Sequence, residues 1–482
     1  MENGLWTLVL TVSLIMGLSF AQTSEICPSH EVISPCSCTL KKSGLDIVCE
    51  YTDLSHITAV MSSLKGKTNA VIFYLRLRHN NLPRLQPYVF LGLDIRHLTI
   101  HNSSLAKLEE SSLSSIGTGL TQLDLSQNTL LSVPSIGLKD LQHLLILNLN
   151  RNKIKAIHNK AFEGLDTLEI LSLYENEISI VEEDAFEGLH NRKLRRLNLG
   201  GNELTKVPTQ ALQTLDMLKK LEIQENRITA IQEGDFEGLK SLDSLVLAHN
   251  QLREVPARVF SHLTQLNSLE LDGNQITHVD PDAFIGLEEN LQYLRLSDNN
   301  LHAVPSDALR RLHRLRHLDL KANNITVLSE DAFTGYGDSI TFLNLQKNLI
   351  KVLPLSVFEN LNSLESLILQ NNKLTHIPEE ATENIVDTLR HIDITDNPLI
   401  CDCKLRWYSV WLGNLRNLDE RMLTKPTVCT MPSEHREYNV QNIPLEKMGC
   451  VGKNAGRTSS TGSFRIYVDT MLQLLTIAIA ML

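Results

Sequence analysis

An octad of the form Leu-x-Leu-x-x-Asn-x-Leu recurs along this chain and constrains its fold more than any other feature. It stands at residues 245–252, again 24 residues later at 269–276, and 24 residues earlier at 221–228. Aligning the Asn of each octad gives fourteen ladder positions, spaced 23 to 26 residues apart. The ladder positions are Asn80, Ser103, Asn128, Asn152, Asn176, Asn202, Asn226, Asn250, Asn274, Asn299, Asn323, Asn348, Asn372 and Asn397.

The spacing within the octad predicts a short strand followed by a turn. In Leu-x-Leu the leucines alternate with period two, so both face the same side of a strand. The Asn side chain carries a donor and an acceptor, so stacked copies can satisfy backbone groups of their own turn and of the next. Ser103 can do only part of this, so we expect a looser second coil. This period and consensus predict an α/β fold, a curved leucine-rich-repeat solenoid with a parallel sheet of about 14 strands on its concave face.

A second repeating position lies ten residues after each ladder position and predicts a buried spine on the convex side. Eight units carry Phe there, four carry Leu and unit thirteen carries Thr382. Stacked rings at a constant offset are typical of a core rather than of a cofactor site. The convex segments are too short for full helices, so we expect extended or 3₁₀ structure there. The Phe residues are Phe90, Phe162, Phe186, Phe236, Phe260, Phe284, Phe333 and Phe358, and the Leu residues are Leu113, Leu138, Leu212 and Leu309.

The residues before and after the repeats indicate export and disulfide-stapled ends. An apolar run and the small residues around Ala21 predict a signal peptide at 1–21, with a membrane anchor as the alternative. Four cysteines precede the repeats and four follow them, with none between, which is typical of disulfides in a secreted chain. Zinc is disfavoured because no His/Cys pair has ligand spacing. The segment from Glu50 to Val71 fits no repeat, and we expect a loop there.

The two cysteine clusters resemble the flanks of extracellular leucine-rich-repeat proteins. The residues on which this resemblance depends are 27–49 followed by Leu54, and 397–411 with Cys429 and Cys450. The resemblance implies the domains 22–70 (N-terminal cap and connecting loop), 71–397 (repeat array) and 398–450 (C-terminal cap), while spacing alone leaves three pairings open in each cluster. The implied disulfides are Cys27–Cys38, Cys36–Cys49, Cys401–Cys429 and Cys403–Cys450.

The tail at 451–482 is small and polar at first and apolar at its end. The apolar run 470–482 is shorter than the roughly 20 residues that a membrane-spanning helix needs. Small residues, a spacer and a terminal apolar stretch indicate a glycosylphosphatidylinositol (GPI) attachment signal, with Asn454 or Ser460 as the lipid attachment site. This predicts a protein anchored on the outer cell surface. Plain secretion and a true membrane span are the alternatives.

The sequence gives no support for catalysis. It lacks the spacings of zinc proteases, serine hydrolases, dinucleotide-binding loops and EF-hands, so we predict no enzyme activity, cofactor or metal. The net charge of −11 argues against nucleic acid as a partner. The sequons at Asn102 and Asn324 predict N-glycosylation. Several His residues at variable positions are expected to be solvated surface, namely His97, His101, His249, His317 and His391.

The strand register predicts which side chains face away from the leucine core. They stand two, four and six residues before each ladder position. Their charges nearly cancel, but several are large and apolar or aromatic, which is typical of a contact surface. One predicted patch is Ile146, Ile170 and Tyr174, and the other is Tyr293, Arg295 and Phe342. The predicted partner-binding residues are Tyr74, Arg76, Ile146, Ile170, Tyr174, Arg196, Val246, Tyr293, Arg295 and Phe342.

Repeats, caps and tail together resemble the arthropod lipid-anchored leucine-rich-repeat adhesion proteins of the chaoptin and connectin type. The resemblance implies a non-enzymatic cell-surface recognition or adhesion protein that binds a protein partner, or the same protein on another cell. Two alternatives stay open within the same superfamily. One is a secreted carrier subunit of an extracellular enzyme, as in decapod shrimp luciferase or carboxypeptidase N. The other is an innate-immune receptor.

Overall fold

The computed structural model describes residues 27–65, 71–189, 193–415 and 426–450. The predicted signal peptide at 1–21 and the predicted tail at 451–482 lie outside these ranges. The chain divides into two compact units, which we describe separately. The larger comprises Met1–Lys373 and Glu380–Ile394, and the smaller comprises Leu374–Glu379 and Thr395–Leu482.

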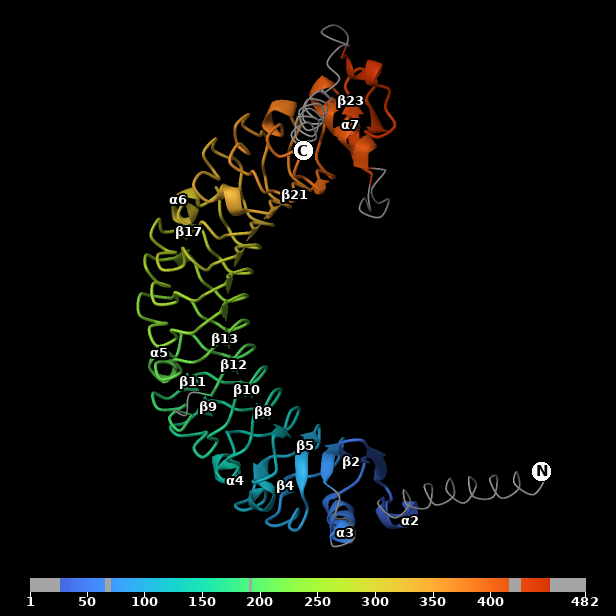
Figure 1. The fold of residues 1–482 in the computed structure, drawn as a ribbon, viewed down its shortest axis with the longest axis vertical. Coiled ribbons are helices and arrows are strands. Elements are labelled where there is room, and N and C mark those ends of the chain that lie inside the picture. Colours follow the sequence, from blue (N-terminus) through green and yellow to red (C-terminus); the bar gives the residue numbers. More distant parts are fainter. Residues whose placement is uncertain (1–26, 66–70, 190–192, 416–425, 451–482) are drawn as a thin grey trace, which may run out of the picture. The chain divides into compact units, whose positions relative to one another are not determined.

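The larger unit is a solenoid whose coils each contribute one strand to a single parallel sheet, which confirms the predicted fold class (Figure 1). In the shorter strands the middle residue, the first Leu or Ile of the octad, is buried. The fourteen strands are β3 (Ile72–Arg78), β5 (Ile95–His101), β7 (Gln122–Asp124), β8 (Ile146–Asn148), β10 (Ile170–Ser172), β12 (Arg196–Asn198), β13 (Lys220–Glu222), β14 (Ser244–Val246), β16 (Ser268–Glu270), β18 (Tyr293–Arg295), β19 (His317–Asp319), β20 (Phe342–Asn344), β21 (Ser366–Ile368) and β22 (His391–Asp393).

The N-terminal cap extends this sheet rather than merely covering it. Strand β2 (Gly44–Glu50) pairs parallel with β3, and β1 (Ser37–Lys41) pairs antiparallel with β2. The sheet therefore has 16 strands among the described residues. Disulfides Cys27–Cys38 and Cys36–Cys49 tie the hairpin, and a single-turn helix α2 (His30–Ile33) precedes it. The hairpin places a hydrogen-bonded strand on the edge that the first coil would otherwise expose.

The ladder residues hold the turns together by hydrogen bonds within and between coils. Asn250 donates from Nδ2 to the carbonyls of Leu247 in its own turn and Ile223 in the preceding coil, both at 3.0 Å. Its Oδ1 accepts from the Ile228 amide at 3.1 Å. The ladder Asn side chains are 1–8% exposed. Ser103 replaces part of this pattern, donating to the carbonyls of Leu77 and His101.

The residue just before each ladder position has a left-handed backbone conformation in all fourteen units. Its φ ranges from 47° to 66°. Only Gly201 and Gly273 are glycines, and the others include Arg151, Glu225 and Lys347. A left-handed residue other than Gly, Asn or Asp costs about 1 kcal/mol. The ladder hydrogen bonds on either side offset this cost, so the turn does not depend on glycine.

The prediction of a loop from Glu50 to Val71 is wrong for part of this segment. Residues Leu54–Leu64 form the helix α3, and Asp53 caps its N-terminus by accepting from the His56 amide at 3.0 Å. Its buried residues Ile57, Val60, Met61 and Leu64 follow helical i, i+3, i+4, i+7 spacing. That spacing and the capping Asp53 are both present in the sequence, but they lie outside the 24-residue repeat on which the fold prediction rests.

The predicted spine is confirmed. All eight Phe residues at the second repeating position are buried, and neighbouring rings stack with centroids 5.9–6.3 Å apart. Three of the Leu units instead form single helical turns, each beginning directly after a Pro. Pro fixes φ for such a start. These turns are α4 (Ser135–Leu138), α5 (Thr209–Leu212) and α6 (Ser306–Leu309).

The rest of the convex side is turns, short 3₁₀ segments and two-residue strands, in keeping with the expectation of extended or 3₁₀ structure. The strands pair between neighbouring coils as β4 (Arg84–Leu85) with β6 (Lys107–Leu108), β9 (Ala156–Ile157) with β11 (Ile180–Val181), and β15 (Glu254–Val255) with β17 (His278–Val279). The 3₁₀ segments are η1 (Ser114–Ile116), η2 (Gly337–Ser339) and η3 (Glu379–Ala381).

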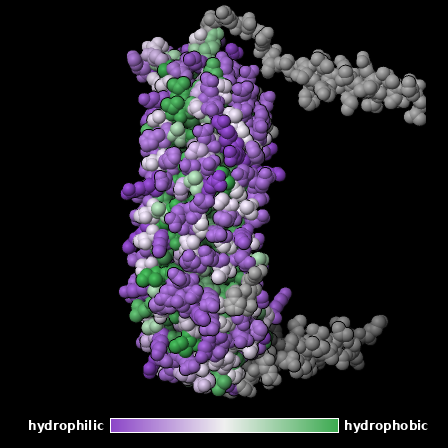
Figure 2. All heavy atoms as spheres, turned by 90° about the vertical axis from the view of Figure 1, so that its left-hand side faces the viewer, coloured by the Kyte–Doolittle hydropathy of each residue, from purple (hydrophilic) through white to green (hydrophobic). Residues whose placement is uncertain are grey.

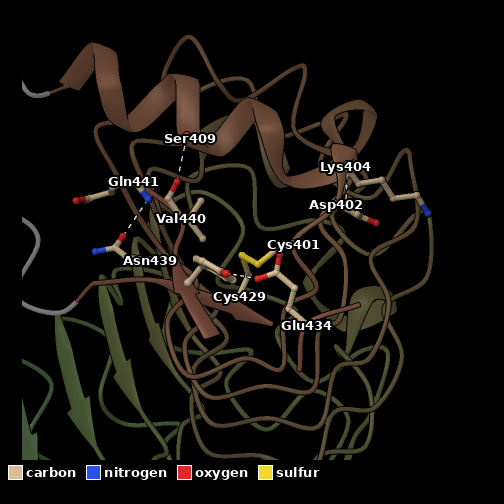
Figure 3. The surroundings of a disulfide bond; sticks show 10 residues. Cys401, Asp402, Lys404, Ser409, Cys429, Glu434, Asn439, Val440 and Gln441 are labelled. Atoms are coloured by element: carbon tan, nitrogen blue, oxygen red, sulfur yellow. Dashed lines mark hydrogen bonds between the residues drawn. A yellow bond between two sulfur atoms is a disulfide. The ribbon is translucent and has the colours of Figure 1, made fainter. Parts of the chain in front are cut away.

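The smaller unit is a disulfide-stapled module. Disulfides Cys401–Cys429 and Cys403–Cys450 join its segments. Figure 3 shows the first of them and the hydrogen bond that the Ser409 hydroxyl donates to the Val440 carbonyl. The indole of Trp407 donates to the Ile377 carbonyl at 2.9 Å. Its elements are η4 (Cys403–Leu405), α7 (Arg406–Leu415), the antiparallel pair β23 (Val428–Met431) and β24 (Arg436–Asn439), and η5 (Leu445–Met448).

Asn250→Ala should destabilise the larger unit, because it leaves the Ile228 amide buried without a partner. It also removes one of the two ladder Asn donors from each of the Ile223 and Leu247 carbonyls. We expect a loss of about 3 kcal/mol in the free energy of unfolding, measured by urea denaturation. Gln251→Ala, on the exposed neighbour, should change it by less than about 0.5 kcal/mol. Hydrogen exchange at the Ile228 amide should also accelerate. Equal stability of the two variants would contradict the role given to the ladder.

Candidate functional site

The candidate site is the face of the sheet that points away from the leucine core. In Figure 1 the strands lie along the inner side of the larger unit's coils. The first and third residues of each short strand flank a buried middle residue, and most are partly exposed. This face presents the positions two, four and six residues before the ladder residue. We call it the inner face.

At the N-terminal end of the inner face, Tyr74 and Arg76 contact each other, and Arg76 also binds a residue of the N-terminal cap. Arg76 binds the carboxylate of Asp46 on β2 at 2.7 and 2.9 Å. Its guanidinium also lies 4.4 Å from the centroid of the Tyr74 ring. The ring of His97 packs edge-on to Tyr74 at 4.8 Å. Burial, and then the charge of Arg76, lower the pKa of His97.

The first predicted patch is only partly assembled. Ile146 and Ile170 pair in register on β8 and β10, and both are half-buried. Tyr174 lies four residues beyond Ile170, roughly 13 Å along the chain direction. It turns instead to Glu225, two coils on, where its hydroxyl donates to Oε2 at 3.0 Å. Burial is the main cause that raises the pKa of Tyr174 to about 12.

Two further predicted residues present less free surface than expected. Arg196, next to Ile170 in register, makes a two-point ion pair with Glu222 at 2.7 and 3.0 Å. Val246 is only 8% exposed, so the expectation that it offers a contact side chain is wrong. Its register neighbours are Glu222 and Glu270, and these longer side chains stand on either side of it.

The second predicted patch contains a cluster of rings on three consecutive strands, and the sequence analysis missed its central member. Tyr293, His317 and Phe342 are register neighbours on β18, β19 and β20. The rings of His317 and Phe342 stack with centroids 4.0 Å apart, and Tyr293 lies 5.9 Å from His317. Tyr293 is 48% exposed. We call these three residues the aromatic strip.

Sequence reasoning placed His317 in solvated surface, and this is wrong. Burial against its neighbours, followed by the charge of Arg295, lowers the pKa of His317. The signal was present, because His317 stands six residues before its ladder Asn, as Tyr293 and Phe342 do. Arg295 beside the strip pairs with Glu270 at 2.9 Å. The strip is therefore flanked by a neutralised ion pair rather than by a free cation.

The described residues offer neither a metal site nor a membrane span. Within them, no group of three or more His, Cys, Asp or Glu is arranged to hold a metal ion. Searched over the same residues, no helix is both long and apolar enough to cross a bilayer. Asn102 is exposed and has a left-handed backbone, and Asn324 is partly exposed, so both sequons lie at the surface.

Comparison with known sequences identifies the repeats. A sequence profile described as Leucine rich repeat matches residues 118–173, 142–191, 192–252, 241–289, 289–337 and 338–399. These matches together cover more than half of the 482 residues. The chain belongs to the leucine-rich-repeat family. Proteins of this family generally mediate protein–protein recognition through an extended inner surface, and they are typically non-enzymatic.

Individual relatives support the fold. The mouse protein "Leucine-rich repeat LGI family member 3" is 33% identical over 55 residues, 11% of this chain and 9% of that protein. A leucine-rich-repeat protein of Leptospira interrogans superposes with a TM-score of 0.59 and 25% identity, covering 78% of this chain and 83% of that one. A chain of the Drosophila Toll–Spätzle complex superposes with a TM-score of 0.54 and 16% identity, covering 88% of this chain and 77% of that one. An internalin of Listeria monocytogenes superposes with a TM-score of 0.51 and 21% identity, covering 70% of this chain and 93% of that one.

Removing the ring that covers His317 should raise the pKa of this residue. Phe342→Ala exposes the imidazole, so the pKa should move up towards its ordinary value of about 6.5. In the unaltered protein the charged form is disfavoured. The stability contributed by His317 is thus present above the unfolded-state pKa and lost as pH falls through the lower folded-state pKa. NMR titration measures the change. Arg295→Gln should give a smaller rise, and an unchanged pKa in Phe342→Ala would contradict the burial of His317.

Proposed function

We propose that this leucine-rich-repeat protein is a non-enzymatic, extracellular recognition or adhesion protein that binds a protein partner on its inner face. The aromatic strip carries the proposal. Three rings lie side by side on consecutive strands, and Tyr293 keeps about half of its surface exposed. Partly exposed aromatic side chains on a rigid support are the groups that dominate binding energy at protein interfaces.

The charged residues of the inner face support a protein rather than a polyanion or polycation as partner. Three of its Arg residues are paired with acidic neighbours, as Arg76–Asp46, Arg196–Glu222 and Arg295–Glu270. Paired charges keep their orientation and add specificity more than affinity. The exclusion of nucleic acid as a partner stays a prediction from net charge.

The location on the cell is a further part of the proposal. The predicted signal peptide at 1–21 would export the chain, and the tail at 451–482 would be exchanged for a lipid anchor at Asn454 or Ser460. Both segments lie outside the described residues. The eight disulfide-bonded cysteines support an oxidising, extracellular environment. The partner is a protein on a neighbouring cell, either another kind of protein or a second copy of this chain.

The double variant Tyr293→Ser/Phe342→Ser should weaken adhesion. Cells that express the full chain are mixed with differently labelled cells that do or do not express it, and aggregates are counted. The partner would cover both rings when it binds, so losing them should weaken binding about tenfold or more. Leu131→Ser/Ile136→Ser, which alters two exposed apolar residues away from the inner face, is the matched control. The two doubles should reach the cell surface equally.

Two outcomes would contradict the proposal. Unchanged aggregation in Tyr293→Ser/Phe342→Ser would remove the aromatic strip from the binding surface, and loss of aggregation in the control would place binding elsewhere.

The same cells test the anchor separately. Phosphatidylinositol-specific phospholipase should release the protein into the medium, and retention on the treated cells would rule out a GPI anchor.

A further inference from the structure

The coils of the larger unit carry a second surface row, four residues after each ladder position. In most coils this row is polar or small, as with Arg84, Lys107, Lys206, Glu254 and His278. Ile180 is an apolar member too, 58% exposed, but it stands between Ala156 and Lys206 in the row. The two consecutive coils that begin at Asn323 and Asn348 instead place two apolar members side by side, Val327 and Val352. These two side chains are 66% and 69% exposed.

Two leucines of the coil that begins at Asn348 enlarge this apolar surface. Leu349 is 39% exposed and Leu355 is 60% exposed. We call Val327, Leu349, Val352 and Leu355 the aliphatic patch. In Figure 2 apolar residues interrupt the mostly hydrophilic outer side of the molecule. Contiguous exposed aliphatic groups call for something that covers them.

The sequon Asn324-Ile325-Thr326 lies directly beside this patch. Asn324 and Leu349 both stand one residue after a ladder position, and the Leu349 amide donates to the Ile325 carbonyl at 2.9 Å. Thr326 is exposed and precedes Val327. The Asn324 side chain makes a single long contact, from Nδ2 to Asn300 Oδ1 at 3.5 Å. Its amide nitrogen is therefore accessible and only weakly held.

We propose that an N-linked glycan on Asn324 covers the aliphatic patch. In the modification, Nδ2 of Asn324 bonds to the anomeric carbon of a lipid-linked oligosaccharide. The carbon–oxygen bond to its diphosphate breaks, the lipid diphosphate leaves and Nδ2 loses one proton. Sugar rings have faces of C–H groups that pack on aliphatic side chains while their hydroxyls stay in water. Val327 is three residues from Asn324, so it lies within about 10 Å of the attachment point.

The other sequon provides an internal comparison. Asn102 lies in an early coil, where the equivalent surface row holds Lys107. Its side-chain amide contacts the ring of His79 at 2.9 Å. A glycan on Asn102 would extend over polar and ring groups rather than over aliphatic side chains. The inference rests on the proposed extracellular function, because attachment of either glycan requires export.

The test uses the full chain expressed in cells that attach N-glycans. Purified protein is compared before and after native enzymatic removal of the glycans, with 8-anilinonaphthalene-1-sulfonate as the probe for exposed apolar surface. Thr326→Ala and Ser104→Ala each break one sequon and keep its Asn. Removing the Asn324 glycan by either route should raise dye fluorescence about twofold or more. Ser104→Ala should leave it unchanged. Val327→Thr/Val352→Thr, which removes two of the four patch residues, should make the rise after enzymatic removal smaller.

Each outcome decides a different point. If mass spectrometry finds Asn102 glycosylated and Asn324 unmodified, this inference fails while the proposed function stands. If neither is modified although the chain reaches the cell surface, this inference fails while the proposed function stands; if the chain does not reach the surface at all, the extracellular part of the proposed function fails with it. If the dye binds the glycosylated and deglycosylated proteins equally, the glycan does not cover the patch, which then remains open to a protein. Enzymatic removal acts on the folded protein and changes only the attachment residue, where hydrolysis of the side-chain amide leaves Asp, so misfolding of a variant cannot account for the result.

Discussion

The side-chain amide of the ladder asparagine is the interaction on which the rest of this structure depends. A chain that turns out of a strand every 24 residues or so leaves carbonyl and amide groups inside the stack. Asn250 shows how they are satisfied, by a bond donated within its own turn and by one donated and one accepted bond that join it to the preceding coil. Because each turn is fixed in this way, the residue before it can adopt a left-handed conformation whatever its type. The strands then stack in register along the whole sheet.

This scaffold separates stability from recognition. The leucines, the ladder asparagines and the Phe spine face inward, so the residues between them can vary without loss of the fold. On the inner face, the charged members largely neutralise each other across strands, as Arg295 does with Glu270. The rings of Tyr293, His317 and Phe342 remain as its most distinctive group. Surface chemistry on the other side of the coils is independent of this face, so a glycan at Asn324 need not interfere with binding.

The periodicity of the sequence was sufficient to predict the solenoid, the strand register and the buried spine, because each depends on spacing along the chain. Helix α3 was missed because it lies outside the repeat. The errors on the inner face share another cause. Whether Val246 is covered, or His317 is packed between rings, depends on neighbours one coil away rather than on adjacent residues. Tyr174 turned to Glu225 for the same reason. Comparing equal offsets in consecutive units would have recovered His317, but the ion pairs and their geometry require coordinates.

The most direct test of this account is a mutational scan of every residue in the array, read out for surface level and for cell–cell binding in the same cells. Substitutions at the ladder positions and leucines should lower surface level and binding together, because they disrupt the fold. Substitutions that lower binding alone should concentrate on the inner face and be most severe at Tyr293, His317 and Phe342. Binding losses concentrated on the convex side, with the inner face tolerant, would contradict the account.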